Sequence, residues 1–192
     1  MKELKFIHIT KCAGTSIENL GKEKKIKWGM FHKEYGHHHR PFREKLLNLR
    51  EKYDWFMVVR NPYTRLVSEF YCHWGGYLGK HDKLNEEQFN NFIKRKVNSR
   101  NENKRFHYVE QIKYYVKSPK IHIIKFENLE EEFNALMEKY DLDIKMERHD
   151  NASRNKKKKF SVESFTPEVI KLINKAYAKD FKKFGYEMID IE

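Results

Sequence analysis

Three short runs of apolar and β-branched residues, each followed by a stretch with helical spacing, constrain the fold of this chain more than any other feature. They span residues 4–10, 55–59 and 121–126. The second run, WFMVV, is apolar throughout, as expected of a central strand in a parallel sheet that is buried on both faces. This alternation predicts an α/β fold with a central, mostly parallel sheet flanked by helices. Residues 26–30 are a candidate for one further strand.

The helical stretches have recognisable start and stop signals. Asn61 followed by Pro62 is a typical cap and first helical residue, and Thr166 followed by Pro167 repeats the pattern. The sequence predicts a short helix after the first strand and longer helices over residues 41–53, 62–74, 86–98, 107–116, 129–140 and from 167 to a stop at Gly185. With 192 residues and no linker or internal repeat, the chain is expected to form one domain over residues 1–192.

Charge restricts the partners of this chain. There are 40 Lys and Arg residues against 28 Asp and Glu, so the formal net charge is +12 and an anionic partner is expected. The 15% of aromatic residues argues against disorder. Neither a signal peptide nor a membrane span is apparent, and two cysteines, Cys12 and Cys72, make no disulfide framework. A cytoplasmic location is therefore expected.

The segment KCAGTS, residues 11–16, follows the first predicted strand and opens a helix. A turn of small residues at a helix start leaves backbone N–H groups pointing outward, which suits a phosphate. Gly14 permits close approach of an anion, and Lys11 adds a mobile positive charge. The alternative is an ordinary helix start capped by Thr or Ser. The Walker order GxxxxGK[ST] is absent, so an ATPase or GTPase is a weak interpretation.

The segment RNPYTRLVS, residues 60–68, follows the second predicted strand. Arg60 stands at the carboxyl end of that strand, where α/β sheets place ligands. Arg65 and Ser68 are three residues apart on one helix face and could hold a second phosphate. The alternative is that arginine here pairs with a local carboxylate such as Glu69. Together, the two segments describe a ligand with phosphates at both ends of a nucleoside.

FIHITKCAGTS followed by VVRNPYTRLVSEFY resembles the sulfotransferases that use 3′-phosphoadenosine 5′-phosphosulfate (PAPS). The most similar branch is the carbohydrate sulfotransferases related to heparan sulfate 2-O-sulfotransferase. The downstream segments IIKFENLEEEFNAL, HDNAS and YAKDFKKFGY resemble that branch in the same order, so the similarity covers most of the chain. The resemblance implies a P-loop-like sulfotransferase fold and sulfuryl transfer from PAPS to a hydroxyl group.

The resemblance also implies roles for particular residues. The 5′-phosphosulfate would be held by the first segment, namely Lys11, Cys12, Ala13, Gly14, Thr15 and Ser16. Arg60 and Ser68 would hold the 3′-phosphate. Arg154 would belong to a basic loop that closes over the nucleotide or substrate, although the run of lysines at 156–159 also fits a solvated surface loop.

The three consecutive histidines at 37–39 offer a general base, because an imidazole with a pKa of about 6.5 can accept a proton at neutral pH. In the related 2-O-sulfotransferases, a His between the two phosphate segments has this role. His38 matches that position best, and His39 or His37 matches after a slip of one residue. The alternatives are an exposed polar loop or a zinc site that includes His32. The donor chemistry itself requires no metal.

The acceptor is expected to be a hydroxyl-bearing molecule, with a glycan favoured by the resemblance and the positive charge; a polysaccharide, a small glycan, a lipid and other hydroxyl acceptors stay open. Trp74 and Tyr77 could stack on sugar rings or belong to the core. Two alternatives from other classes are a P-loop-like nucleotide kinase and a basic nucleic-acid-binding module. The sulfotransferase interpretation predicts no nucleic-acid partner.

Overall fold

The computed structural model describes residues 2–26, 28, 39, 41, 51–102, 106–117, 121–147 and 158–191. Contacts between residues divide the chain into two compact units, which we describe separately. The sheet unit comprises Met1–Arg60 and Lys113–Ala152. The helical unit comprises Asn61–Ile112 and Ser153–Glu192.

The sheet unit is built on three parallel strands in the order β1-β2-β3, which are β1 (Leu4–Ile7), β2 (Asp54–Val59) and β3 (Ile121–Lys125). All three predicted strands are confirmed, and β2 is central, as its continuous apolar run predicted. Phe6 lies opposite Phe56, and Met57 lies opposite Ile123. The first strand ends at Ile7 and not at residue 10, because only His8 makes a further bridge and the turn before the first helix begins at Thr10.

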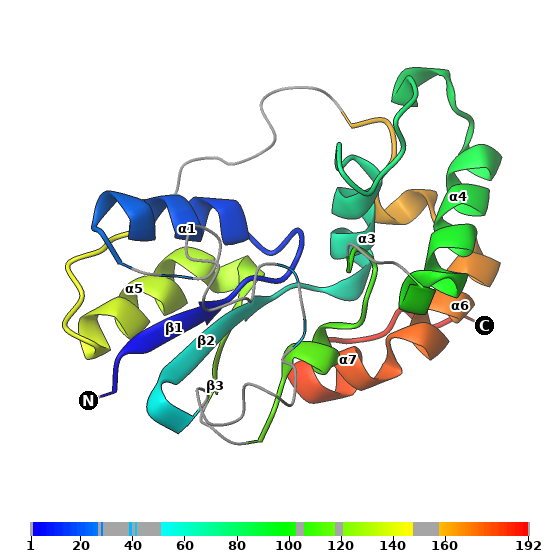
Figure 1. The fold of residues 1–192 in the computed structure, drawn as a ribbon. Coiled ribbons are helices and arrows are strands. Elements are labelled where there is room, and N and C mark those ends of the chain that lie inside the picture. The colour runs from blue at the N-terminus through cyan, green and yellow to red at the C-terminus, as the bar shows by residue number, and fades with distance from the viewer. Residues whose placement is uncertain are drawn as a thin grey trace. The chain divides into compact units, whose positions relative to one another are not determined.

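Helices α1 (Gly14–Glu23) and α5 (Leu129–Lys139) cover one face of this sheet (Figure 1). The buried indole of Trp28 lies on that face, with its ring centroid 6.2 Å from Phe6 and 5.4 Å from Phe56. Phe133 of α5 contacts the same indole at 6.4 Å. A Cβ added at Gly21 of α1 would lie only 2.4 Å from the Trp28 ring, so glycine lets α1 approach closely. Aromatic packing therefore fixes both helices on the sheet.

The helical unit contains α3 (Pro62–Phe70), α4 (Glu86–Asn98), α6 (Pro167–Ala176) and α7 (Ala178–Phe184). Its core is aromatic. The rings of Phe70 and Phe89 meet edge-on with their centroids 4.8 Å apart, and the ring of Phe89 stacks on that of Phe160 with centroids 4.6 Å apart. The Asn61 side chain caps α3 by accepting a hydrogen bond from the Tyr63 N–H (2.9 Å), as predicted. The helix predicted over residues 86–98 is confirmed in full.

One helix prediction in this region was wrong and two differ in extent, since α3 ends at Phe70 and not near residue 74. In place of a helix over residues 107–116 there is a short 3-10 turn, Gln111–Tyr114. The reason is that the N–H groups of Gln111 and Ile112 donate to the two carboxylate oxygens of Asp180, each at 2.8 Å, and not to carbonyls of a preceding helical turn. The last predicted helix is divided at Tyr177, whose hydroxyl donates to the Tyr108 carbonyl (2.6 Å).

Replacing Asp180 with alanine is expected to lower the free energy of unfolding by about 2–6 kcal/mol, because one buried and one partly buried N–H group would lose their acceptor at about 1–3 kcal/mol each. Urea unfolding measures this difference. The isosteric variant Asp180→Asn, which keeps one acceptor, should lose less. An Asp180→Ala protein as stable as wild type would contradict this account.

The same residue makes the stability depend on pH. Burial raises the pKa of the Asp180 carboxyl, so the folded protein holds this proton to a higher pH than the unfolded chain does. As the pH rises from below the unfolded value of about 3.9, the wild type should therefore lose stability relative to Asp180→Asn. A series of urea unfolding curves across the acid range tests this sign.

Candidate active site

The loop between β1 and α1, Lys11–Ser16, contains two residues with a left-handed backbone. Lys11 and Ala13 both adopt left-handed conformations, with φ of 60° and 58°, which non-glycine residues seldom adopt. Turns of this kind direct successive backbone N–H groups into one concave surface. Cys12 is buried, whereas Lys11 is half-buried and Thr15 exposed.

The start of α1 has no side-chain cap among the described residues. Ala13 occupies the cap position, and its carbonyl accepts the first helical hydrogen bond from Ile17 (3.2 Å). The first turn contains no acidic residue, so nothing in it offsets the positive end of the helix dipole. The alternative of a helix start capped by Thr or Ser is therefore wrong. The N–H groups of Gly14, Thr15 and Ser16 have no partner inside the helix, as in every first turn.

A buried histidine supports this loop from below. His8 and Glu18 are almost fully buried, and His8 Nδ1 lies 3.6 Å from Glu18 Oε1. A Cβ added at Gly14 would lie 2.0 Å from His8 Cδ2, so the backbone of the loop rests directly against the imidazole. Neither His8 nor Glu18 was predicted from the sequence as a residue of this site. The signal that could have found His8 is a polar residue inside an otherwise apolar strand.

Replacing Gly14 with alanine is expected to destabilise the protein by about 1–3 kcal/mol, because the new methyl group would overlap the buried imidazole of His8. Urea unfolding measures the loss. The matched control is Ala13→Gly, which removes a Cβ from a left-handed position and should leave stability equal or slightly higher. Equal stability of Gly14→Ala and wild type would contradict the close contact.

Arg60 lies directly after β2, beside the same loop. Its Nη1 donates to the Lys11 carbonyl (3.3 Å), and its guanidinium lies 4.1 Å from the centre of the Phe126 ring. Phe126 directly follows β3, so the carboxyl ends of all three strands contribute to one small region of the sheet unit. Because adjacent parallel strands end at the same edge, this convergence follows from the topology. The structure thus brings together Lys11 and Arg60.

His39 also lies beside the loop. Its backbone N–H donates to the His8 carbonyl (3.0 Å), and its own carbonyl accepts a hydrogen bond from the Tyr114 hydroxyl (2.8 Å). The imidazoles of His39 and His8 meet edge-on, with centroids 4.6 Å apart. His37 and His38 lie outside the described residues.

The remaining predicted residues belong to the helical unit or lie outside the described residues. Arg65 is buried in the helical unit, where it lies 3.7 Å from Glu69 and donates to the Val109 carbonyl (2.8 Å), so the alternative of a locally paired arginine is correct for Arg65. Ser68 is half-buried on α3. Arg154 lies outside the described residues. Trp74 is 70% exposed and so does not belong to the core.

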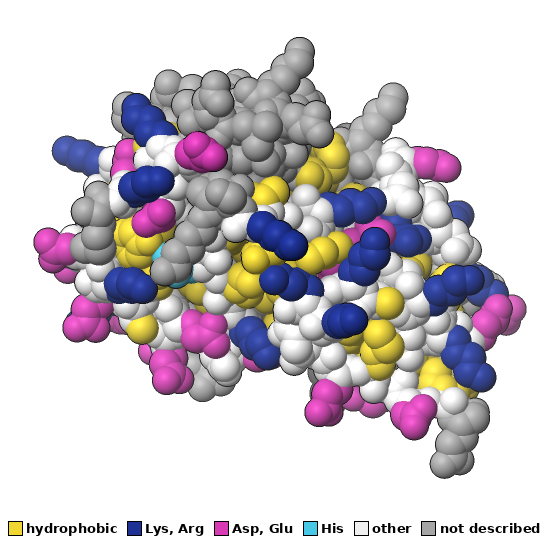
Figure 2. Space-filling view, turned by 90° about the horizontal axis from the view of Figure 1, so that it is seen from below, with side chains coloured by type: hydrophobic (Ala, Val, Ile, Leu, Met, Phe, Trp, Pro, Cys, Tyr) yellow, Lys and Arg dark blue, Asp and Glu magenta, His cyan; other side chains and the backbone are white. Residues whose placement is uncertain are grey.

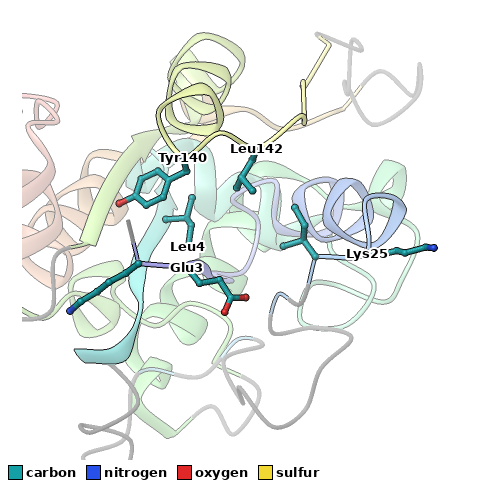
Figure 3. Close-up of a pocket in the computed structure, with 7 residues that line it drawn as sticks. Glu3, Leu4, Lys25, Tyr140 and Leu142 are labelled. Carbon is teal, nitrogen blue, oxygen red and sulfur yellow. The ribbon is translucent and has the colours of Figure 1, made fainter.

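A separate hollow of about 380 Å³ lies at the amino ends of the strands (Figure 3). Leu4, Lys25, Tyr140 and Leu142 are among its lining residues. The Tyr140 hydroxyl donates to Asp54 (2.8 Å), and burial, together with this carboxylate, raises the pKa of Tyr140. None of the predicted phosphate-binding residues lines this hollow.

The described fold is that of an α/β protein with a parallel sheet. At one edge of the sheet, an arginine lies beside a helix start that has no side-chain cap. Comparison with protein families matches residues 2–187 to the sulfotransferase family. The chain belongs to the sulfotransferase family. No curated protein and no solved structure gives a significant match. Within the described residues, no helix has the length and apolar character needed to cross a membrane.

Proposed function

We propose that this sulfotransferase takes its sulfuryl group from PAPS and transfers it to a hydroxyl group of a carbohydrate. The observation that carries the proposal is the hydrogen bond between Arg60 and the Lys11 carbonyl, which holds a guanidinium beside an uncapped helix start. A donor with anionic groups at both ends of a nucleoside needs two cationic or N–H-rich sites close together.

The 5′-phosphosulfate would bind to the loop. The N–H groups of Gly14, Thr15 and Ser16 would donate to its oxygens, with the Lys11 ammonium adding a positive charge. Cys12 and Ala13 would contribute through their backbone, since the Cys12 side chain is buried. Arg60 would bind the 3′-phosphate. Roles for Ser68 and Arg154 at that phosphate stay predictions of the sequence resemblance.

Sulfuryl transfer resembles phosphoryl transfer, in which positioning and charge stabilisation do most of the work. An imidazole of the triplet would take the acceptor hydroxyl proton as the acceptor oxygen bonds to sulfur. The bond from sulfur to the bridging phosphate oxygen would break, releasing adenosine 3′,5′-bisphosphate. Lys11 and the loop N–H groups would stabilise the charge that develops on this leaving phosphate. No metal is needed for this step.

The sequence favours His38 as the base, with His39 and His37 as alternatives. What supports His39 is its ring contact with His8, the residue packed against Gly14. Alanine replacements at the three positions, one at a time, test the assignment. The base is the residue whose loss lowers kcat without weakening donor binding, whereas full activity in all three variants would exclude a unique histidine base.

Thermal unfolding with nucleotides tests the donor. A ligand at 100 times its Kd stabilises by about 2.7 kcal/mol, which for a chain of this size raises Tm by roughly 5–10 °C. We expect this shift with adenosine 3′,5′-bisphosphate and a much smaller one with AMP or ATP. Equal shifts with all three nucleotides would contradict the proposal. Steeply salt-dependent binding of DNA or RNA, without a preference for the 3′-phosphate, would favour a nucleic-acid-binding module.

The carbohydrate acceptor is supported by the net charge of +12, which suits anionic glycans, and by the exposed indole of Trp74. Figure 2 shows Lys and Arg side chains spread over one face, with Asp and Glu among them and at its edges. Labelled PAPS offered with anionic polysaccharides, neutral glycans and simple alcohols tests the acceptor class. We expect label in the polysaccharide fraction, and label only in simple alcohols would contradict a carbohydrate acceptor.

A further inference from the structure

Three side chains of types that bind transition metals meet inside the helical unit, and the proposed sulfuryl transfer uses none of them. Glu69, Cys72 and His107 each offer a ligand atom, and these atoms all lie within 4.8 Å of one another. Glu69 and His107 are almost fully buried, and Cys72 is 9% exposed. The His107 Nδ1 atom lies 2.6 Å from Glu69 Oε2.

The local backbone holds these ligands in place. Glu69 is in the last turn of α3, and the Cys72 N–H donates to the Glu69 carbonyl (3.0 Å). The chain then turns back, with the Gly76 N–H donating to the Cys72 carbonyl (2.8 Å). A Cβ at Gly75 would lie 2.4 Å from His107 Cγ, so only glycine lets this turn pack directly on the imidazole. The turn and the ring therefore form a closely fitted cradle.

Two of the three ligands can carry a negative charge. A Cys72 thiolate and a Glu69 carboxylate would offset the two positive charges of a divalent ion in a buried place where charge is costly, and the Arg65 guanidinium beside Glu69 would remain as a third positive charge. The two carboxylate oxygens have different neighbours: Oε2 is near His107, and Oε1 lies 3.7 Å from the Arg65 guanidinium. Glu69 can thus use one oxygen for a metal while the other stays near Arg65, which also donates to the Val109 carbonyl (2.8 Å).

The identity of the ligands selects the metal. Thiolate and imidazole are ligands for zinc, whereas Mg²⁺ and Ca²⁺ take oxygen ligands almost alone. Zinc binds its ligands at about 2.0–2.3 Å in a tetrahedron, so ligand atoms lie about 3–4 Å apart. In this structure, His107 Nδ1 and Glu69 Oε2 are 2.6 Å apart, and no two of the three ligand atoms are more than 4.8 Å apart. These separations differ from those of a tetrahedral zinc site by about 1 Å. We propose that Glu69, Cys72 and His107 form a Zn²⁺ site in the helical unit, separate from the donor chemistry.

Cobalt spectroscopy of the full chain tests the site. Chelator-treated protein is titrated with Co²⁺, and we expect one ion per chain with a thiolate-to-cobalt charge-transfer band in the near ultraviolet. Zinc should displace the cobalt and abolish the band. Cobalt held by imidazoles alone does not give this band, so binding at other histidines is distinguished. A wild-type titration without a charge-transfer band would overturn the proposal.

The two cysteines supply a matched pair of variants. Cys72→Ser should abolish the band, and His107→Gln should weaken metal affinity by at least ~100-fold, since even outer-shell changes cost about 10–100-fold. Cys12→Ser, which removes the other cysteine, should keep the band. An undiminished band in Cys72→Ser, or its loss in Cys12→Ser alone, would overturn the assignment.

Thiol alkylation provides a test that needs no variant, in case Cys72→Ser does not fold. Zn²⁺ added to chelator-treated wild type should slow the alkylation of Cys72 and leave that of Cys12 unchanged, with each peptide followed by mass spectrometry. Equal alkylation rates of Cys72 with and without zinc would contradict the site. Neither outcome bears on adenosine 3′,5′-bisphosphate binding, which is measured separately.

Discussion

Arg60→Ala is expected to weaken binding of adenosine 3′,5′-bisphosphate by about 2–5 kcal/mol, which is the cost of truncating one partner of a desolvated charge pair. This corresponds to a rise in Kd of about 30-fold to several thousand-fold. The physical reason is that the 3′-phosphate would lose the guanidinium that stands beside the Lys11 carbonyl. Isothermal titration calorimetry with the purified variant measures the change.

Two controls separate a phosphate contact from a general disturbance of the loop. The variant Arg60→Lys keeps the charge but loses the planar fork, so its affinity should fall between those of wild type and Arg60→Ala. AMP, which lacks the 3′-phosphate, should bind wild type and Arg60→Ala with similar affinity. Unchanged affinity for the bisphosphate in Arg60→Ala would refute the assignment of this residue.

Lys11→Ala is expected to lower kcat by about 10²-fold or more, the scale seen when one stabiliser of developing charge is removed. Its ammonium is proposed to act on the leaving phosphate, where negative charge increases as the bond to sulfur breaks. Because alanine can retain the left-handed backbone that Lys11 adopts with φ of 60°, the loop should keep its shape. Initial rates at saturating PAPS give kcat directly.

The matched control is Lys22→Ala, which removes the same charge from the last turn of α1, the helix that follows the Lys11 loop. This variant should keep the wild-type kcat, since the position is exposed and lies at the far end of α1. A higher KM for PAPS with an unchanged kcat in Lys11→Ala would show that the lysine binds the donor without assisting transfer. Equal losses in the two variants would indicate an effect of net charge alone.

Much of the fold could be predicted because its signals are local. The apolar run of β2 predicts a central strand, and Asn61 with Pro62 predicts the start of α3, since each depends on a few neighbouring residues. The short turn at Gln111–Tyr114 could not be predicted in this way. Its N–H groups bond to Asp180, which is 68 and 69 positions away in the sequence. Tertiary contacts of this kind override helical spacing.

The site was predictable to the extent that it follows from strand topology. Lys11 and Arg60 were placed at the carboxyl ends of two strands, and adjacent parallel strands bring such residues to one edge. A histidine in the predicted first strand could have drawn attention to His8, but its contact with Gly14 was not predictable, because the sequence gives no sign of which backbone the ring packs against. The sequence also left open whether Arg65 pairs with Glu69 or binds a ligand, although the two residues are only four positions apart. The burial of both side chains decides for the pair, and burial is seen only in the folded chain.

The zinc proposal shows a different limit of sequence reasoning. Cys72 alone, or His107 alone, resembles many buried residues of the same type, and 35 positions separate the two. Only the folded chain brings the thiol, the imidazole and the Glu69 carboxylate within 4.8 Å. The histidine triplet is a more conspicuous metal-binding pattern in the sequence, yet adjacent residues cannot easily direct all three rings to one ion.

The crystal structure of the complex with adenosine 3′,5′-bisphosphate tests the central claim most directly. The account predicts the 5′-phosphate within hydrogen-bonding distance of the Gly14, Thr15 and Ser16 N–H groups, with the 3′-phosphate on the Arg60 guanidinium. A nucleotide bound elsewhere, or one whose 3′-phosphate makes no contact with Arg60, would contradict it.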